Sequence, residues 1–348
     1  DLDLRRPSGM AVREFVPGNR IYANGQRFQP RYYHFEADSS SAAIFQVDNA
    51  VGAVAEIGAG QAQGTLGAGL LRAVPICDVD MTHLSQISDD EENRFQLPVA
   101  VYGYELGRHA GGQVYHWGTR DILLRRGVHF RLVNVGAVSL IDDAARLGYP
   151  VCLVCGQSRS PFSSQTERDR FAEDHQQRCG QRVQPTGFYT DVVADALSIP
   201  ACANREEAYS LLEALRTGAT RVLEMEADDL SILVIGQAGQ EETLGLLYDP
   251  MPGGSGLLDQ ICARFSEVVA SASEVVNDCP SLCARACIDC LFTFRNAFFH
   301  QRLNRGLAGD KLAALGTELS PSHPIPSRLP VATPSGRQMP VNVAEMRL

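Results

Sequence analysis

Four cysteines crowd into the twelve residues from Cys279 to Cys290, with the spacing C-x3-C-x3-C-x2-C. Thiolates are common ligands of structural zinc, which takes four ligands in a tetrahedron. Such a site can replace a hydrophobic core where the local chain is too short to build one. The pattern therefore predicts a structural zinc site, with an iron–sulfur cluster as the alternative, since such clusters also take four thiolates. The predicted ligands are Cys279, Cys283, Cys287 and Cys290.

A second group of metal-binding residue types, Cys152, Cys155, His175 and Cys179, has the pattern C-x2-C followed by H-x3-C. The spacing of four places His175 and Cys179 on one face of a predicted helix. Finger-type zinc sites present their second ligand pair in this way. The group predicts a second structural zinc site, and the alternative is a redox pair of cysteines beside an unrelated histidine. Because each site offers four protein ligands, neither leaves a position for catalytic water.

The basic residues of this 348-residue chain are thirty arginines and one lysine, Lys311, and the net charge is −10. Phosphate-binding loops and protein kinases need a lysine in a specific motif that the chain does not contain, so no Walker or catalytic motif is present. No apolar run approaches the roughly 20 residues of a membrane-spanning helix, and the start does not read as a signal peptide. Clustered thiols then favour a reducing compartment, and we expect a cytoplasmic protein without membrane contact.

Residue patterns predict an α+β fold in three parts and a tail. Asn24-Gly25 between alternating segments is a strong hairpin signal. Apolar residues at helical spacing follow residue 205, two strands span residues 231–248, and a helix is expected from about Leu257 to Val276. The expected parts are a β-rich N-terminal domain (1–148), a zinc-knuckle insertion (149–182), an α/β domain with the four-cysteine site (183–316) and a flexible tail rich in proline and serine (317–348).

Arginines and phenylalanines alternate directly after the four-cysteine segment. Spacings of seven and three predict that Arg295, Arg302 and Arg305 share one helical face, beside Arg285 in the metal loop. These four arginines are the predicted nucleic-acid-binding residues, since arginine binds phosphates and aromatic rings stack on bases. The alternative is that the phenylalanines are core residues and the arginines form a solvated face. The glycine-rich segment 250–256 predicts either an anion-binding nest or a plain sharp turn.

The order of features from residue 190 to 312 resembles a known zinc-binding domain, the MZB type associated with mitomycin-repair helicases. The resemblance rests on TDVV, EEAYSLLEAL, LLYDPMPGGSG, the four close cysteines and CLFTFRNAFFHQRLNR. REFVPGNRIYANGQRF and YPVCLVCG are similar to segments that precede that domain. The domain forms the C-terminal part of many bacterial superfamily 2 helicases and occurs in the helicase-associated subunit of the DISARM phage-defence system.

The resemblance implies that the cysteines from Cys279 to Cys290 bind metal and that a helicase is near. The motor lobes of such helicases are absent here, so we expect them upstream in a longer protein or on a partner chain; the chain begins at Asp1 rather than Met. The expected function is an accessory, DNA-engaging zinc module of a helicase system in DNA repair or phage defence. The alternative is a zinc-stabilised scaffold that docks to a helicase partner without contacting DNA.

Overall fold

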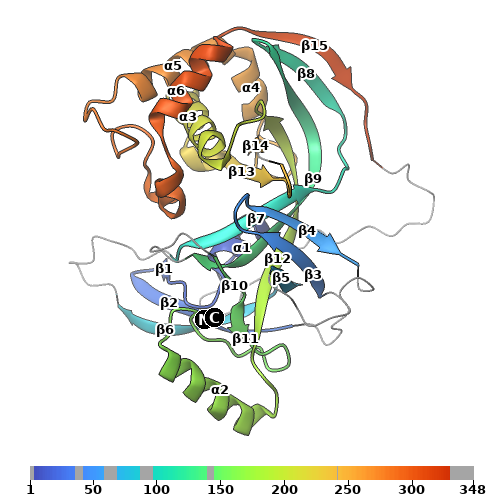
Figure 1. The fold of residues 1–348 in the computed structure, drawn as a ribbon, viewed down its shortest axis with the longest axis vertical. Coiled ribbons are helices and arrows are strands. Elements are labelled where there is room, and N and C mark those ends of the chain that lie inside the picture. Colours follow the sequence, from blue (N-terminus) through green and yellow to red (C-terminus); the bar gives the residue numbers. More distant parts are fainter. Residues whose placement is uncertain are drawn as a thin grey trace.

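Two long antiparallel strands, β9 (Arg120–Val138) and β12 (Gln184–Ser198), run through the whole molecule (Figure 1). The computed structural model describes residues 4–35, 42–58, 69–86, 97–138, 145–240 and 242–329. The two strands pair from Phe188↔Asn134 to Leu197↔Leu124, with a bulge at Ala194/Ala196. Since β12 begins at the predicted boundary near residue 183 and pairs with β9 from the predicted N-terminal domain, the predicted parts share one sheet.

The other strands extend this sheet on both sides. Its order is β15-β8-β9-β12-β5-β3-β4, with β7 and β10 also on β9, β11 and β14 also on β12, and β13 on β14. Only the pair β12–β5 of the main path is parallel. The remaining strands are β3 (Ala43–Asp48), β4 (Ala53–Ile57), β5 (Leu70–Pro75), β7 (Val99–Glu105), β8 (Gly112–Trp117), β10 (Ala145–Leu147), β11 (Tyr149–Val151), β13 (Ser231–Gly236), β14 (Thr243–Tyr248) and β15 (Leu319–Ile325).

The N-terminal part adds a small second sheet of order β1-β2-β6 and the short helix α1. Asn24 and Gly25 both have positive φ (49° and 71°) between β1 and β2, which confirms the predicted hairpin. These elements pack their apolar residues against one face of β9 and β12. Their bounds are α1 (Ser8–Glu14), β1 (Ile21–Ala23), β2 (Gln26–Tyr33) and β6 (Val79–Gln86).

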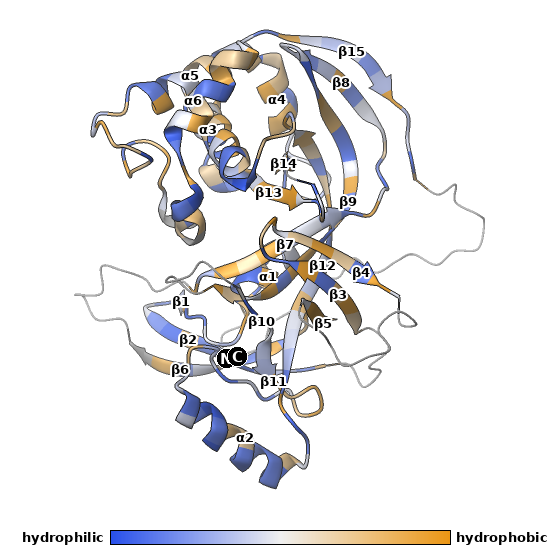
Figure 2. Ribbon diagram, viewed as in Figure 1, coloured by the Kyte–Doolittle hydropathy of each residue, from blue (hydrophilic) through white to orange (hydrophobic). Residues whose placement is uncertain are grey.

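The C-terminal part packs a layer of helices on the sheet (Figure 2). Asn204 caps helix α3 by accepting from the amide of Glu207 at 2.9 Å. Gly218 lies in this helix because a Cβ there would come within 2.5 Å of the Val268 carbonyl of α5. The predicted helix 257–276 is divided at Arg264 into α4 and α5. The bounds are α3 (Arg205–Leu223), η2 (Ala227–Asp229), α4 (Leu257–Ala263), α5 (Phe265–Asn277), η3 (Phe294–Arg302) and α6 (Arg305–Leu315).

The prediction of a flexible tail is wrong for residues 319–325, which form strand β15. Residues 319–325 pair antiparallel with β8, from Leu319↔Trp117 to Ile325↔Gly112, and Trp117 Nε1 donates to the Gly316 carbonyl at 2.7 Å. The prediction failed here because an edge strand is held by its backbone and needs little apolar burial, and prolines are tolerated at a sheet edge. Residues 330–348 of the predicted tail lie outside the described residues.

The fold class is α+β, as predicted, with strands throughout and, apart from α1 and α2, the helices on the C-terminal half of the sheet. Among the described residues, none of the helices has the length and apolar content needed to cross a membrane.

Candidate metal centres

The four-cysteine loop brings the Sγ atoms of Cys279, Cys283, Cys287 and Cys290 together directly after α5. The Sγ–Sγ distances are 3.7 Å (279–283), 3.5 Å (279–287), 3.7 Å (283–290) and 3.9 Å (287–290). Four sulfurs at about 2.3 Å from one zinc ion lie about 3.8 Å apart along the edges of a tetrahedron. A cluster of several irons would hold its sulfurs farther apart, so the geometry fits a single ion and favours zinc.

Backbone turns fold this loop tightly around its centre. The amide of Leu282 donates to the Cys279 carbonyl at 2.9 Å, and the amide of Cys290 donates to the Cys287 carbonyl at 3.1 Å. The amide of Cys287 also points at Cys290 Sγ at 3.1 Å. Leu282 has a left-handed backbone (φ 48°), which is uncommon for a residue with a branched side chain. The ligand set therefore holds the chain in a path that this segment would not adopt alone.

Two thiols of this loop differ in their acidity. Burial raises the pKa of Cys279, but hydrogen bonds from the Cys283 amide and from neighbouring thiols outweigh it and lower the pKa to about 7. Burial raises the pKa of Cys290 to about 12. Zinc binds thiolates, so ion binding must displace protons from this site, and its affinity must fall as the pH falls.

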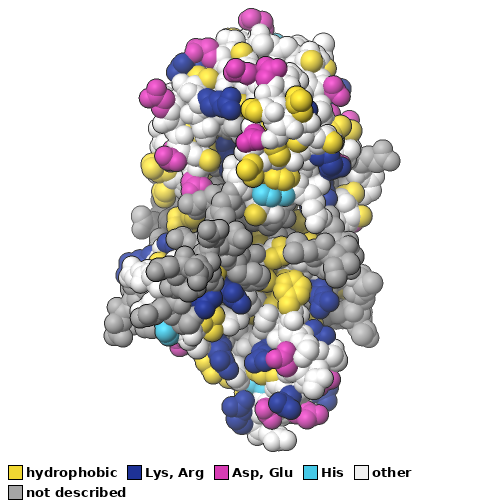
Figure 3. All heavy atoms as spheres, turned by 90° about the vertical axis from the view of Figure 1, so that its left-hand side faces the viewer, with side chains coloured by type: hydrophobic (Ala, Val, Ile, Leu, Met, Phe, Trp, Pro, Cys, Tyr) yellow, Lys and Arg dark blue, Asp and Glu magenta, His cyan; other side chains and the backbone are white. Residues whose placement is uncertain are grey.

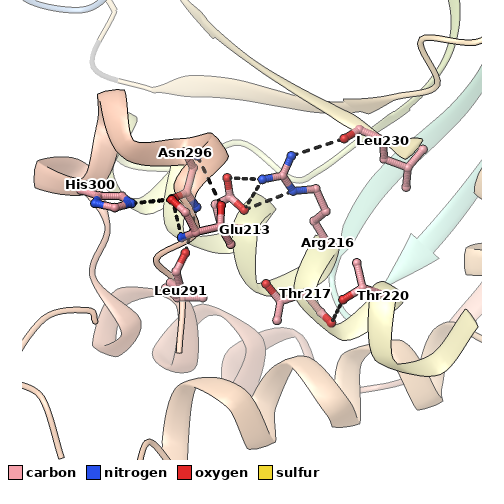
Figure 4. Close-up of polar contacts among 9 residues, drawn as sticks. Glu213, Arg216, Thr217, Thr220, Leu230, Leu291, Asn296 and His300 are labelled. Atoms are coloured by element: carbon pink, nitrogen blue, oxygen red, sulfur yellow. Dashed lines mark hydrogen bonds and ion pairs between the residues drawn. The ribbon is translucent and has the colours of Figure 1, made fainter. Parts of the chain in front are cut away.

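A buried polar network supports the loop from the helix layer (Figure 4). The Arg216 guanidinium donates to both carboxylate oxygens of the buried Glu213, with Nη2 at 2.8 Å from each, and Nη1 donates to the Leu230 carbonyl at 3.3 Å. Glu213 also shares a hydrogen bond with Asn296, which donates to the Leu291 carbonyl at 2.8 Å. The network therefore joins α3 to the residue that follows the last cysteine ligand.

Sequence reasoning missed this network. Glu213 and Arg216 stand three residues apart in a helix segment that is otherwise apolar, and this spacing was the available signal. Burial raises the pKa of Glu213, while the adjacent Arg216 guanidinium lowers it. Both charges of this buried ion pair lose their hydration, which offsets much of their attraction. The pair therefore contributes little net stability, and its main effect is to fix the position of α3 relative to its partners.

The second group forms a separate centre at the other end of the molecule. Cys152 and Cys155 lie in a tight turn, where the Gly156 amide donates to the Cys152 carbonyl at 2.9 Å. Helix α2 (Gln165–Cys179) supplies His175 and Cys179. Cys152 Sγ lies 4.0 Å from Cys179 Sγ, and Cys155 Sγ lies 3.2 Å from His175 Nε2. All four ligand atoms lie within 4.8 Å of one another, as one tetrahedral ion requires.

Helix α2 depends on this centre. It is almost entirely hydrophilic (Figure 2), and His175, which is 1% exposed, is its one buried residue. Ser164 and Glu167 form a capping box and Gly180 ends the helix with φ 72°, but a 15-residue helix without an apolar face is marginal in water. A histidine buried here, with Nε2 beside Cys155 Sγ, matches a zinc ligand and not a surface residue. The chain thus has two structural zinc sites.

The predicted helical face of arginines is wrong. Arg295 and Arg302 lie in the 3-10 segment η3, whose backbone is non-helical at Asn296 and Phe299. Leu303 is extended, and Arg305 begins the separate helix α6. The spacing of seven and three does not place the three arginines on one helical face, because the chain changes direction between η3 and α6.

Three of the four predicted nucleic-acid-binding arginines, Arg285, Arg302 and Arg305, interact with other residues of the chain, and the side chain of Arg295 lies outside the described residues. Arg305 donates from Nε to the Cys283 carbonyl and from Nη1 to the Val276 carbonyl, both at 2.7 Å. Arg285 is ion-paired with Glu206 and donates to the Gln301 carbonyl at 2.9 Å. These contacts attach the metal loop to its surroundings, and a role of the four arginines in binding DNA stays a prediction.

The neighbouring phenylalanines and the glycine loop have internal partners too. The Phe292 ring stacks on His300 at 3.9 Å and the Phe299 ring on Tyr209 at 4.7 Å, so both rings belong to the packed layer. In the segment 250–256, the buried Asp249 carboxylate accepts hydrogen bonds from the Met251 and Ser255 amides. These two amides are therefore satisfied by the chain itself, which favours the plain turn over an anion nest.

Comparison with known proteins agrees with the four-cysteine geometry. Residues 211–291 match the family model described as the MrfA Zn-binding domain. This segment is similar to a zinc-binding domain of the MrfA type. It runs from α3 to the residue after Cys290 and includes all four predicted ligands of the first centre. No curated protein matches the chain.

Solved structures similar to the chain include a "DUF1998 helicase MrfA bound to DNA", with 15% identity and a TM-score of 0.36 over 88% of this chain and 39% of that chain. A second is a "DUF1998 helicase MrfA", with 10% identity and a TM-score of 0.37 over 84% of this chain and 30% of that chain. The chain thus spans less than two fifths of the length of these relatives.

Proposed function

We propose that the chain is an accessory zinc-binding module of a bacterial superfamily 2 helicase system, engages DNA and acts in the cytoplasm, in DNA repair or phage defence. The observation that carries the proposal is the tetrahedral four-cysteine centre inside a segment that matches the MrfA Zn-binding domain. MrfA, whose solved structures are similar to this chain, is a helicase. The motor lobes would come from a further segment or a partner chain.

The single lysine supports a non-motor role. Lys311 Nζ donates to the Ala201 carbonyl at 3.1 Å and lies 3.5 Å from the Glu207 carboxylate, next to the start of α3. This lysine is used to join α6 to α3. A motor ATPase of this class needs a lysine on the nucleotide phosphates, and the chain has no second lysine to offer.

DNA binding by the purified chain tests the proposal. Binding of labelled single-stranded and duplex DNA is measured between about 50 and 200 mM salt, where phosphate contacts make log K fall linearly with log salt. The variant Arg295→Glu with Arg302→Glu should bind more weakly, with the salt slope reduced by about 1 for each lost contact. Arg221→Glu, at an exposed position near the end of α3, is the matched control. If the parent chain bound neither single-stranded nor duplex DNA, the proposal that it engages DNA would be overturned.

A second candidate function is docking to a helicase partner without DNA contact. Leu282 and Ile288, both on the four-cysteine loop, are each 82% exposed. Two bare aliphatic side chains on a rigid loop are typical of residues that a protein partner covers. Under this alternative, association with the motor chain would be insensitive to salt and would weaken in the Leu282→Ser variant, and DNA binding would be absent.

A further inference from the structure

Positive charge is concentrated away from the four-cysteine loop. Residues 4–35 and 78–86, which contain α1 and the sheet β1-β2-β6, together with the knuckle residues 145–183, hold twelve arginines against seven acidic residues. Residues 200–318, around the four-cysteine site, hold nine basic against seventeen acidic residues. Figure 3 shows one face, with mostly Asp and Glu side chains above and Arg side chains interspersed with some Asp and Glu below. A polyanion would therefore be attracted to the knuckle end of the molecule.

Two exposed arginine–aromatic pairs lie at this end. Arg31 lies over the Tyr32 ring at 5.9 Å, and Arg146 lies over the Phe162 ring at 5.8 Å. Tyr32 is 40% exposed and Phe162 is 42% exposed. Each pair combines a cation with an accessible flat ring. We call these four residues the knuckle surface.

A bulge in β2 produces the first pair. Neighbouring residues of a regular strand point to opposite faces of a sheet. The register between β2 and β6 shifts between Pro30 and Tyr32, so that both Arg31 and Tyr32 are exposed. Bulges re-aim side chains and are frequent beside functional sites. The bulge thus interrupts the regular pairing of β2 with β6 and places a ring and a guanidinium side by side in solvent.

The zinc knuckle joins the two pairs. Tyr32 forms a bridge with Gln157, and the Ser158 amide donates to the Arg31 carbonyl at 3.0 Å. Arg146 Nη1 donates to the Pro161 carbonyl at 3.5 Å, next to Phe162. Phe162 lies five positions after Gln157, so the pairs are linked by at most about 18 Å of chain. The metal-bound turn directly before Gln157 holds this segment in place.

Three carboxylates in this neighbourhood have other partners, among them Asp80, which stands opposite Tyr32 on β6 and is paired with His34 at 3.0 Å. Glu14 is paired with Arg6 at 3.1 Å, and Glu167 is held by the Ser164 hydroxyl and amide, both at 2.9 Å. Across the part of the chain that the structure describes, Arg31 and Arg146 take part in no ion pair. Their charges are therefore available to an external anion.

We propose that the knuckle surface binds single-stranded DNA, with Arg31 and Arg146 contacting phosphates and Tyr32 and Phe162 stacking on unpaired bases. This inference rests on the proposed function and names the strand and the residues that would engage it. Exposed rings next to cations are the recurring means of binding single strands without sequence preference. Duplex DNA would meet the arginines alone, because its bases are already stacked.

Binding of a labelled oligothymidine and of a duplex of equal length tests the proposal. Tyr32→Ala with Phe162→Ala should weaken single-strand binding roughly 5-fold or more and leave duplex binding within about 2-fold. Arg31→Ala with Arg146→Ala should weaken both and reduce the single-strand salt slope by about 1.4. Tyr32→Phe keeps the ring and should bind like the parent. Arg221→Ala is the charge control on the acidic half, and two bound zinc ions with unchanged thermal unfolding verify each variant.

The outcomes separate this inference from the proposed function. A parent that binds single strands while the aromatic variant binds equally well would overturn the knuckle surface and leave DNA engagement standing. Loss of duplex and single-strand binding to the same degree in the aromatic variant would overturn base stacking. A parent that binds no DNA would overturn both. Weakening only in Arg295→Glu with Arg302→Glu would move the binding surface to the four-cysteine half.

Discussion

Arg305 donates from its guanidinium Nε to the backbone carbonyl of Cys283 at 2.7 Å, across 22 residues of chain. The same side chain reaches the Val276 carbonyl in the last turn of α5, and the Arg305 amide donates to the Arg285 carbonyl at 2.6 Å. One residue at the start of α6 thus ties the helix before the metal loop to the middle of the loop. The loop is held by its metal and by this clamp together.

Replacement of Arg305 by methionine should loosen the loop. Methionine keeps much of the side-chain volume but leaves the carbonyls of Cys283 and Val276 without a donor, which costs about 1–3 kcal/mol for each group that stays buried. We expect a lower thermal unfolding temperature and faster zinc transfer to a chelator. Arg221→Met is the control, since it removes an exposed arginine. Equal zinc transfer from both variants would show that the clamp is dispensable.

Replacement of Cys287 by serine should remove one zinc ion per chain and unfold the helix layer. Three remaining thiolates leave the site open, and the buried Cys279 and Cys290 then lose the ion that holds them. Zinc content by elemental analysis should fall from two ions to one, and α5 and α6 should become protease-sensitive. Cys262→Ser, a cysteine of α4 outside both centres, should retain two zinc ions. Iron in place of zinc in the parent would contradict the assignment of the ion.

Replacement of His175 by glutamine should release only the knuckle zinc. Helix α2 buries no other residue, so it should unfold locally while the four-cysteine centre and the long strands persist. Limited proteolysis within residues 165–179, together with one remaining zinc ion, is the expected result. Glu173→Gln, at an exposed position of the same helix, serves as the control. A helix that stays protected without zinc would show that packing suffices to hold it.

His300 should make stability depend on pH. Burial lowers the pKa of His300, and a hydrogen bond to the Thr293 carbonyl opposes this only in part. The unfolded chain therefore binds a proton more readily than the folded chain just below pH 6.5, and the free energy of unfolding falls on acidification through that range. Denaturant titrations of the parent and His300→Gln, with zinc in excess, should converge as the pH falls from about 7.5 to 5.5. Curves that keep their separation down to pH 5.5 would contradict this role of His300.

The sequence by itself determined the two ligand sets and most local elements. Cysteines spaced this closely can reach the same metal ion, so the ligands of each site can be read from the sequence. Asn24-Gly25 specifies a turn with positive φ at both residues, which few other residues adopt. The apolar spacing of α3 likewise located its buried face, including Leu211, Leu212 and Leu215. Each of these features depends on interactions within some thirty residues, and such interactions can be read from spacing.

Only the tertiary structure decided which distant segments of the chain contact one another. The pairing of β12 with β9, the strand made by residues 319–325 and the clamp from Arg305 to Cys283 each join positions far apart in the chain. Spacing in the sequence carries no record of such contacts, so the contact of Arg305 with the metal loop could not be predicted from it. The adjacent exposure of Arg31 and Tyr32 likewise depends on a register shift against β6, since a regular strand would have turned one of them inward.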